Sequence, residues 1–103
     1  MPIILTYNIN GIRAAIKKDL PKWINSTSAD IVCLQEIKAK EEQFDKEIFE
    51  EYGYGSYIKS AEKPGYSGVA IISKIKPQYI EYECGISKID SEGGFIRLDF
   101  ENY

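Results

Sequence analysis

Polar side chains follow two apolar segments of the sequence, at the points where strands are expected to end. Asn8 and Asn10 follow the first segment, and Glu36 and Lys38 follow the second. In sheets flanked by helices, ligands collect at the carboxyl ends of the strands. One carboxylate beside amide oxygens suits Mg²⁺ or Mn²⁺, which keep waters or substrate phosphate as further ligands. These residues form a candidate metal site, although each taken singly is also interpretable as a turn, cap or solvated strand end.

The two apolar segments, residues 3–7 and 31–35, are rich in β-branched residues and typical of buried strands. Between them, apolar residues recur at helical spacing from Ile12 to Ile24 with basic residues interspersed. This pattern predicts an amphipathic helical stretch, with Asn10 as its N-cap. A crossover of this length predicts a right-handed β-α-β unit with parallel or near-neighbour strands.

The helical stretch is expected to break, because Pro21 lacks a backbone donor and disfavours helix at the residue before it. We predict the break near Asp19, with Asp19 capping a second short helix that runs to Asn25. A further surface helix is predicted over residues 41–51, whose first turn is acidic. Its expected buried face consists of Phe44, Ile48 and Tyr52.

After Gly53 the pattern changes to short strand candidates separated by Gly, Pro and Lys, which predicts an antiparallel meander. The candidates are residues 54–59, 69–73, 79–84 and 95–100. Helices are expected only in the first half, although α/β layers need cover on both faces of their sheet. We therefore interpret residues 1–103 as a single partial domain of a larger α/β fold.

Composition excludes several classes of function. The 103 residues include 13 Lys and Arg, 16 Asp and Glu and no His, with a formal charge of −3. A polybasic nucleic-acid tail is excluded, so a nucleic-acid site must be a local patch. Without histidine, this chain alone builds neither a Ser-His-Asp or Cys-His system nor a histidine-ligated zinc site.

The apolar runs are far shorter than the roughly 20 residues that span a bilayer, and the N-terminus does not resemble a signal peptide. Cys33 and Cys84 are expected to be reduced core thiols of a cytoplasmic protein.

Four segments resemble one known family in wording and order. They are Tyr-Asn-Ile-Asn-Gly-Ile-Arg-Ala at 7–14, Asp-Ile-Val-Cys-Leu-Gln-Glu-Ile-Lys at 30–38, Gly-Tyr-Ser-Gly-Val-Ala-Ile at 65–71 and Asp-Ser-Glu-Gly at 90–93. They resemble the exodeoxyribonuclease III / apurinic-apyrimidinic endonuclease family, a branch of the endonuclease/exonuclease/phosphatase superfamily. The resemblance implies the N-terminal half of a four-layer α/β sandwich of the DNase I-like type, with a mixed, mostly antiparallel sheet and helices on one face.

The resemblance also implies a function and a cofactor. A whole member of the family would be a Mg²⁺-dependent (or Mn²⁺-dependent) DNA-repair nuclease, acting as a 3′-5′ exonuclease and as an endonuclease at abasic sites. Glu36 would be the metal ligand, Asn8 would assist it and position the metal-bound phosphate, and both would be catalytic. Lys38 would lie just behind the metal ligands.

Double-stranded DNA with abasic sites or 3′ ends would be the partner of the complete enzyme, and no membrane is implied. The resemblance places Asn10 beside the metal and the DNA, and Arg13 and Lys18 on backbone phosphates. Tyr66 and Gly68 would belong to a loop that presses against the DNA backbone. The alternatives are a solvated helix face for the two basic residues and a turn aromatic for Tyr66.

Two departures from the family pattern concern activity. Gly94 stands where relatives continue Asp-x-Glu-Gly with Arg, and Arg97 is expected on the opposite strand face. The later family motifs, namely Asp-x-Asn, a further carboxylate, Tyr-x-Pro-Asn and Ser-Asp-His, are absent, so the 103-residue chain alone is expected to be inactive. Two alternatives stay open, namely a phosphoesterase acting on a small phosphate ester and a non-catalytic DNA-binding or interaction half-domain. Self-association is expected through an apolar sheet face near Val69, Ile71, Ile96 and Leu98.

Overall fold

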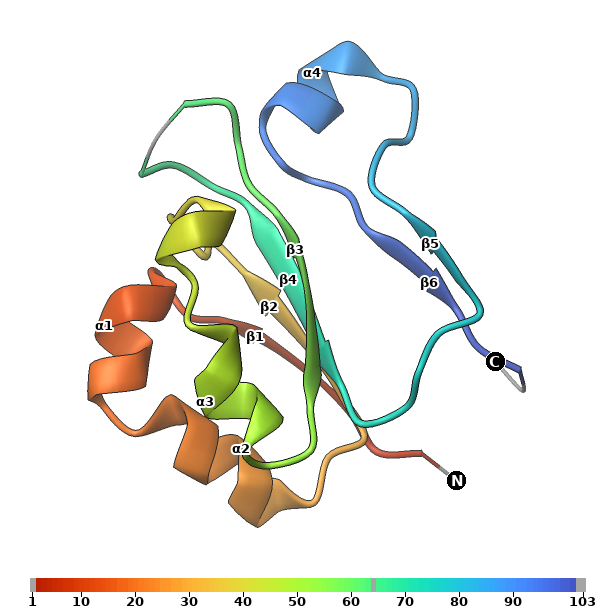
Figure 1. Cartoon of the computed structure of the whole chain (residues 1–103). Coiled ribbons are helices and arrows are strands. Elements are labelled where there is room, and N and C mark those ends of the chain that lie inside the picture. Colours follow the sequence, from red (N-terminus) through yellow and green to blue (C-terminus); the bar gives the residue numbers. More distant parts are fainter. Residues whose placement is uncertain (1, 64, 102–103) are drawn as a thin grey trace.

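The computed structural model describes residues 2–63 and 65–101 (Figure 1). The elements follow one another as β1 (Ile4–Asn8), α1 (Ile12–Lys17), α2 (Leu20–Thr27), β2 (Ile31–Gln35), the 3₁₀ turn η1 (Glu41–Gln43), α3 (Lys46–Glu50), β3 (Gly55–Lys59), β4 (Val69–Ser73), β5 (Tyr79–Glu81), α4 (Ser87–Ser91) and β6 (Arg97–Asp99). None of the helices in this described part is long and apolar enough to cross a membrane.

A four-stranded sheet carries the first half of the chain, in the order β1-β2-β4-β3. β1 and β2 pair in parallel, which confirms the predicted β-α-β unit, and β4 runs antiparallel to both β2 and β3. The prediction that the last four strands form one antiparallel meander is wrong. β3 and β4 belong to the first sheet, whereas β5 and β6 form a separate antiparallel pair with α4 between them.

The helices differ from the prediction at their ends. The break at Asp19 is confirmed, since this residue adopts φ 66°, but α2 continues past Asn25 to Thr27. Asn10 does not cap α1, because Gly11 occupies that N-cap position. Asp19 occupies the N-cap position of α2 as predicted, but its side chain makes no capping hydrogen bond. The side-chain oxygen of Asn10 is instead an acceptor for the ammonium group of Lys38, a residue far away in the sequence.

The helix expected over residues 41–51 is interrupted. Phe44 is extended, with φ −94° and ψ 114°, and separates η1 from α3. This conformation lets Phe44 enter the core, where its ring stacks on that of Phe49 at 5.5 Å between centroids. Ile48 and Tyr52, expected on the buried face, are only partly buried.

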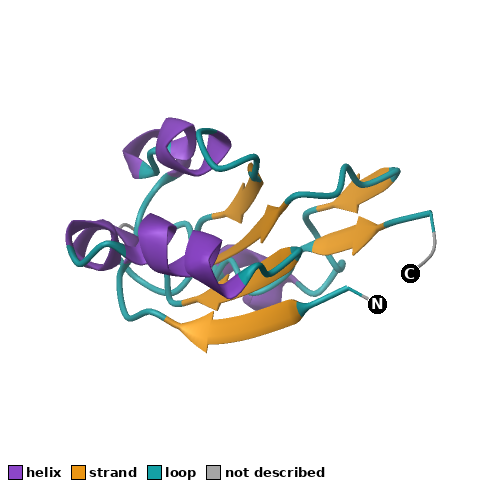
Figure 2. Ribbon diagram, turned by 90° about the horizontal axis from the view of Figure 1, so that it is seen from below, coloured by secondary structure: helices purple, strands orange, loops and turns teal. Residues whose placement is uncertain are grey.

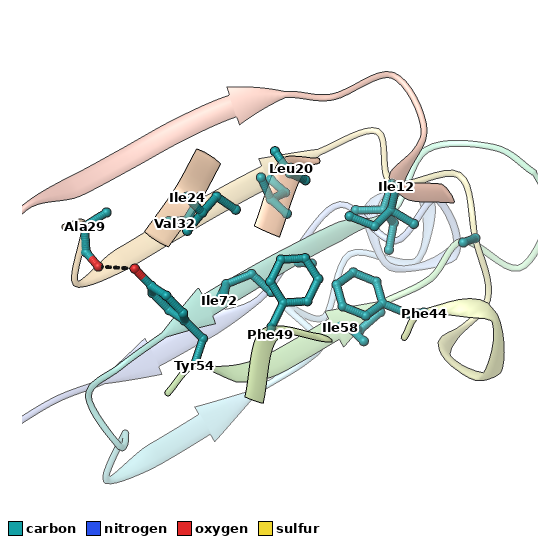
Figure 3. Packing of buried hydrophobic residues seen from close by; sticks show 14 residues of the cluster. Ile12, Leu20, Ile24, Ala29, Val32, Phe44, Phe49, Tyr54, Ile58 and Ile72 are labelled. Carbon is teal, nitrogen blue, oxygen red and sulfur yellow. Dashed lines mark hydrogen bonds between the residues drawn. The ribbon is translucent and has the colours of Figure 1, made fainter. Parts of the chain in front are cut away.

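The core lies between the sheet and α1, α2 and α3, which cover one of its faces (Figure 1). Val32 and Ile72 enter it from the central strands, and Ile12 and Ile24 from the helices (Figure 3). The hydroxyl of buried Tyr54 donates to the carbonyl oxygen of Ala29 at 2.6 Å, which ties the start of β3 to the turn after α2.

Two expectations about burial are wrong. β1 is not a buried strand, because it is paired on one side only and lies at the margin of the sheet (Figure 2). Ile4 and Tyr7 are therefore 56% and 50% exposed. Both cysteines are free, but only Cys33 is partly buried, and this burial raises the pKa of its thiol. Cys84 is exposed rather than a core residue.

Candidate functional site

The connections that follow β1 and β2 run side by side. Asn8 lies opposite Gln35 in the parallel ladder, and three further backbone hydrogen bonds continue the pairing beyond the strands. These bonds run from Ile9 N to Gln35 O (3.2 Å), from Gly11 N to Glu36 O (2.8 Å) and from Ile12 N to Ile37 O (2.8 Å). The backbone thus brings the polar residues after β1 next to those after β2.

Four side chains at this edge of the sheet are linked in pairs across the two connections. The amide of Asn8 donates to a carboxylate oxygen of Glu36, and the ammonium of Lys38 donates to the amide oxygen of Asn10. The other end of the Asn8 amide, its Oδ1, accepts the backbone N–H of Asn10 at 3.1 Å. The structure therefore brings together all four residues predicted at the candidate metal site.

The backbone at this site is strained. Asn10, Glu36 and Lys38 adopt positive φ angles of 48°, 53° and 51°, which side-chain-bearing residues rarely occupy. Each such residue costs on the order of 1–3 kcal/mol and persists only where its surroundings hold it, as often occurs at active sites and ligand clamps. The hydrogen bonds between the two connections supply that support. The strain therefore marks the two connections as a candidate ligand site.

The donors present at the site fit a hard divalent cation. Within residues 2–63 and 65–101 there is no group of three or more His, Cys, Asp or Glu side chains around a common point. The donor set is one carboxylate, Glu36, held by the amide nitrogen of Asn8, whose amide oxygen accepts the backbone N–H of Asn10. No ion pair to Glu36 occurs in the part of the chain that is described, because Lys38 is engaged with Asn10. One carboxylate without an ion-pair partner among the described residues is compatible with Mg²⁺, which commonly keeps several waters and takes one or two carboxylates.

A second loop, residues 65–68, lies against the same site. The backbone N–H of Lys38 donates to Ser67 O at 2.8 Å, and that of Ile37 donates to Gly68 O at 3.2 Å. Tyr66 is 56% exposed at the tip of the loop. Gly68 is buried, and a Cβ atom there would lie 2.9 Å from Cγ1 of Ile37. Gly68 therefore allows the loop to approach Ile37 closely, while the exposed Tyr66 side chain is accessible to a ligand.

The basic residues of α1 lie at its two ends. Arg13 is exposed, and its guanidinium is 3.4 Å from the carbonyl oxygen of Lys38, so it borders the site. Lys18 is exposed at the other end of α1, where it lines a groove of 570 Å³ together with Asn10, Tyr7 and Trp23. The structure thus places Arg13 at the site and Lys18 further along the same surface.

Sequence reasoning missed one side chain beside Tyr66. The ammonium of Lys63 lies 4.1 Å from the centre of the Tyr66 ring, a cation–π contact that adds an exposed positive charge to the loop. The sequence feature that could have predicted this contact is the spacing of Lys63, three positions before Tyr66. Arg97, in contrast, is engaged away from this loop, since its guanidinium donates twice to the Asp99 carboxylate at 2.9 Å.

Comparisons of the sequence with known proteins point to one family. The sequence profile of the Endonuclease/Exonuclease/phosphatase family matches residues 5–101. An exodeoxyribonuclease of Bacillus subtilis is 39% identical over 96% of this chain and 38% of its own length. The DNA repair nuclease APEX1 of Danio rerio is 35% identical over 97% of this chain and 33% of its own length. This chain thus spans well under half the length of the curated relatives it matches.

Solved structures give the same result for the fold. An AP endonuclease from Archaeoglobus fulgidus superposes with a TM-score of 0.86 at 28% identity, covering 98% of this chain and 38% of the other. The catalytic domain of Xenopus laevis APE2 superposes with a TM-score of 0.63 at 42% identity, over 76% of this chain and 26% of that one. The fold is therefore a mixed α/β fold of the DNase I-like type, as expected, and it covers part of the length of these neighbours.

Proposed function

Because this chain belongs to the endonuclease/exonuclease/phosphatase family, we propose that it is the N-terminal portion of a Mg²⁺-dependent DNA-repair nuclease. The complete protein would hydrolyse phosphodiesters of duplex DNA at abasic sites or 3′ ends. The names of the relatives support this choice, since they include an exodeoxyribonuclease and a DNA-(apurinic or apyrimidinic site) endonuclease of Dictyostelium discoideum. A cytoplasmic location remains part of the proposal.

One observation carries the proposal, namely the linked side chains at the ends of β1 and β2. A carboxylate that forms no ion pair among the described residues, held on strained backbone beside the Asn8 amide, is suited to bind a divalent ion. Glu36 and Asn8 would hold the ion, which when bound supplies positive charge against the phosphate of the scissile bond. The hydrogen bond to Lys38 orients Asn10 at the rim of the same site.

The DNA would lie across the exposed side of this site. Arg13 borders it, and the exposed Tyr66 belongs to the loop that packs against it, so both would contact backbone phosphates. Lys18 extends the positive surface along α1. These contacts position the duplex without reading its sequence, as expected for an enzyme that recognises a lesion or an end.

The test is incision of a duplex with one abasic site by the complete product of the coding region. We expect Mg²⁺-dependent incision that is lost in Glu36→Gln, which keeps the size of the side chain but removes its charge. Metal affinity should fall in parallel, whereas DNA affinity should stay equal or rise, because a negative charge near phosphates is removed. Glu42→Gln, at an exposed residue of η1, is the matched control and should incise normally.

Two results would overturn the proposal. One is hydrolysis of a small phosphate ester without any DNA incision, which would favour a phosphoesterase of the same family. The other is incision by Glu36→Gln at the unmutated rate under limiting Mg²⁺, which would show that this carboxylate is not the metal ligand.

A further inference from the structure

The segment after α4 packs against the connection between β3 and β4, which carries Tyr66 (Figure 1). Two backbone hydrogen bonds join them. Glu62 N donates to Ser91 O at 2.8 Å, and Gly68 N donates to Glu92 O at 3.3 Å. The Tyr66 loop is therefore held from this side by residues that follow it by more than twenty positions.

Gly93 makes the closest approach within this contact. It is buried and adopts φ 64°. A Cβ atom at Gly93 would lie 2.6 Å from the backbone nitrogen of Ala61, 2.6 Å from the carbonyl carbon of Ser60 and 2.8 Å from its oxygen. These are backbone atoms, which cannot move aside as the end of a flexible side chain can. Any other residue would push the segment and the β3–β4 connection apart.

The opposite side of the loop rests on the metal-site backbone through the bonds from Ile37 and Lys38 described above. The loop is thus clamped between residues 36–38 and residues 90–93. Asp90 anchors the second of these segments, because its carboxylate accepts the backbone N–H groups of Cys84 at 2.9 Å and Gly85 at 3.1 Å.

We propose that Gly93 is a positioning residue for DNA cleavage: its contact with the Ser60–Ala61 backbone sets where Tyr66 stands relative to Glu36. The loop and the carboxylate must meet the same DNA backbone, so a shift of one against the other misplaces the scissile phosphate. This inference rests on the proposed function for its catalytic meaning, but the clamp itself is a property of the 103-residue chain.

The clamp is tested first in the chain alone, by amide hydrogen exchange. Gly93→Ala should speed exchange of the Gly68 amide by about tenfold or more, and that of Lys38 in the same direction, while the β1–β2 ladder keeps its protection. Gly53→Ala is the matched control, because Gly53 has φ 87° and no atom within 4 Å of a built Cβ. It imposes the backbone strain without the clash. Unchanged protection at Gly68 and Lys38 in Gly93→Ala would overturn the inference.

The functional consequence is tested with the complete product and an abasic duplex. We expect Gly93→Ala to raise KM by about tenfold, with a smaller change in kcat and no change in the Mg²⁺ concentration needed. On a Tyr66→Ala background the same substitution should add little, because the positioned side chain is already absent. Fully additive effects would refute the positioning role.

A second variant covers the case in which Gly93→Ala does not fold. Asp90→Asn weakens the anchor without a clash and should change Gly68 exchange and KM in the same direction by a smaller factor. If the unmutated product cleaves no DNA, the proposed function fails, whereas the exchange result still decides whether Gly93 holds the loop.

Discussion

At the scale of single residues, the two cations that border the candidate site, Lys38 and Arg13, are used differently. The ammonium group of Lys38 donates a hydrogen bond to the amide oxygen of Asn10, so it is engaged within the protein. Among the described residues, Arg13 forms a single polar contact, at the long distance of 3.4 Å to the backbone carbonyl of Lys38, and it is exposed, so its charge remains available to a ligand. Arg13 is therefore the better candidate for a phosphate contact.

Arg13→Ala in the complete product should accordingly weaken duplex binding and make it less dependent on salt, with the slope of log K against log salt reduced by about 1. Metal affinity should stay nearly unchanged. Fluorescence anisotropy at several salt concentrations measures the slope. Lys22→Ala, at an exposed residue of α2, is the control for loss of a positive charge elsewhere on the surface. Equal slopes for both variants and the unmutated protein would contradict the assignment.

At the scale of elements, the strands were predictable where a continuous apolar run ends in a turn. β2 and β4 have the predicted bounds, because their runs are flanked by polar or glycine residues on both sides. The crossover length predicts parallel or near-neighbour strands, and the observed parallel pairing of β1 with β2 brings the residues after the two strands together. The core of the candidate site was thus accessible from the sequence.

The errors arose where a distant partner outweighs local preference. Asn10 does not cap α1, since Lys38 engages its side chain, and Phe44 leaves the helical conformation to enter the core. α4 has five residues and no apolar periodicity, so the local sequence pattern does not predict it. The clamp on the Tyr66 loop consists of backbone contacts between distant segments, which leave no periodic signature.

The anchor of α4 should make this region sensitive to acid. The backbone N–H of Cys84, together with its thiol and the N–H of Gly85, lowers the pKa of Asp90 below its ordinary value of 3.8. A carboxyl whose pKa is lowered by folding stabilises the folded state above its ordinary pKa. That contribution is lost as pH falls through the lowered value.

In Asp90→Asn, the free energy of unfolding should therefore decrease less between about pH 5 and pH 2 than in the unmutated chain. The measurement is the urea midpoint of tryptophan and tyrosine fluorescence as a function of pH. Asp45→Asn is the control, because Asp45 is exposed at the start of α3 and makes no capping hydrogen bond. The same smaller decrease in both variants would count against a specific role for Asp90.

At the scale of the whole molecule, the four-stranded sheet ends at two edge strands, β1 and β3, of which β1 is the more exposed. β1 presents an unpaired edge together with half-exposed apolar side chains, and such edges pair readily with other chains. Val69 and Ile71, on the face away from the helices, are only partly covered. The apolar side chains of the predicted self-association face are thus less exposed than those of the β1 edge.

We therefore expect the 103-residue chain to self-associate through β1. Sedimentation velocity should show a concentration-dependent shift, which Ile4→Lys should reduce because a charge at a strand edge opposes edge pairing. Ile86→Lys is a matched control, since Ile86 is also 56% exposed but lies outside any strand. A monodisperse monomer with a sharp unfolding transition, unaffected by Ile4→Lys, would contradict this expectation.

The last prediction concerns activity of the chain by itself. Hydrolysis needs a group that takes a proton from the attacking water. Glu36 is the only carboxylate of the candidate site among the described residues, and it is assigned to the metal; Lys38 is committed to Asn10, and the chain has no histidine. We therefore expect the pure 103-residue chain to leave an abasic duplex intact in Mg²⁺, over a time in which the complete product incises all of it. Incision that follows the chain through purification and disappears in Glu36→Gln would show that these 103 residues already contain the base.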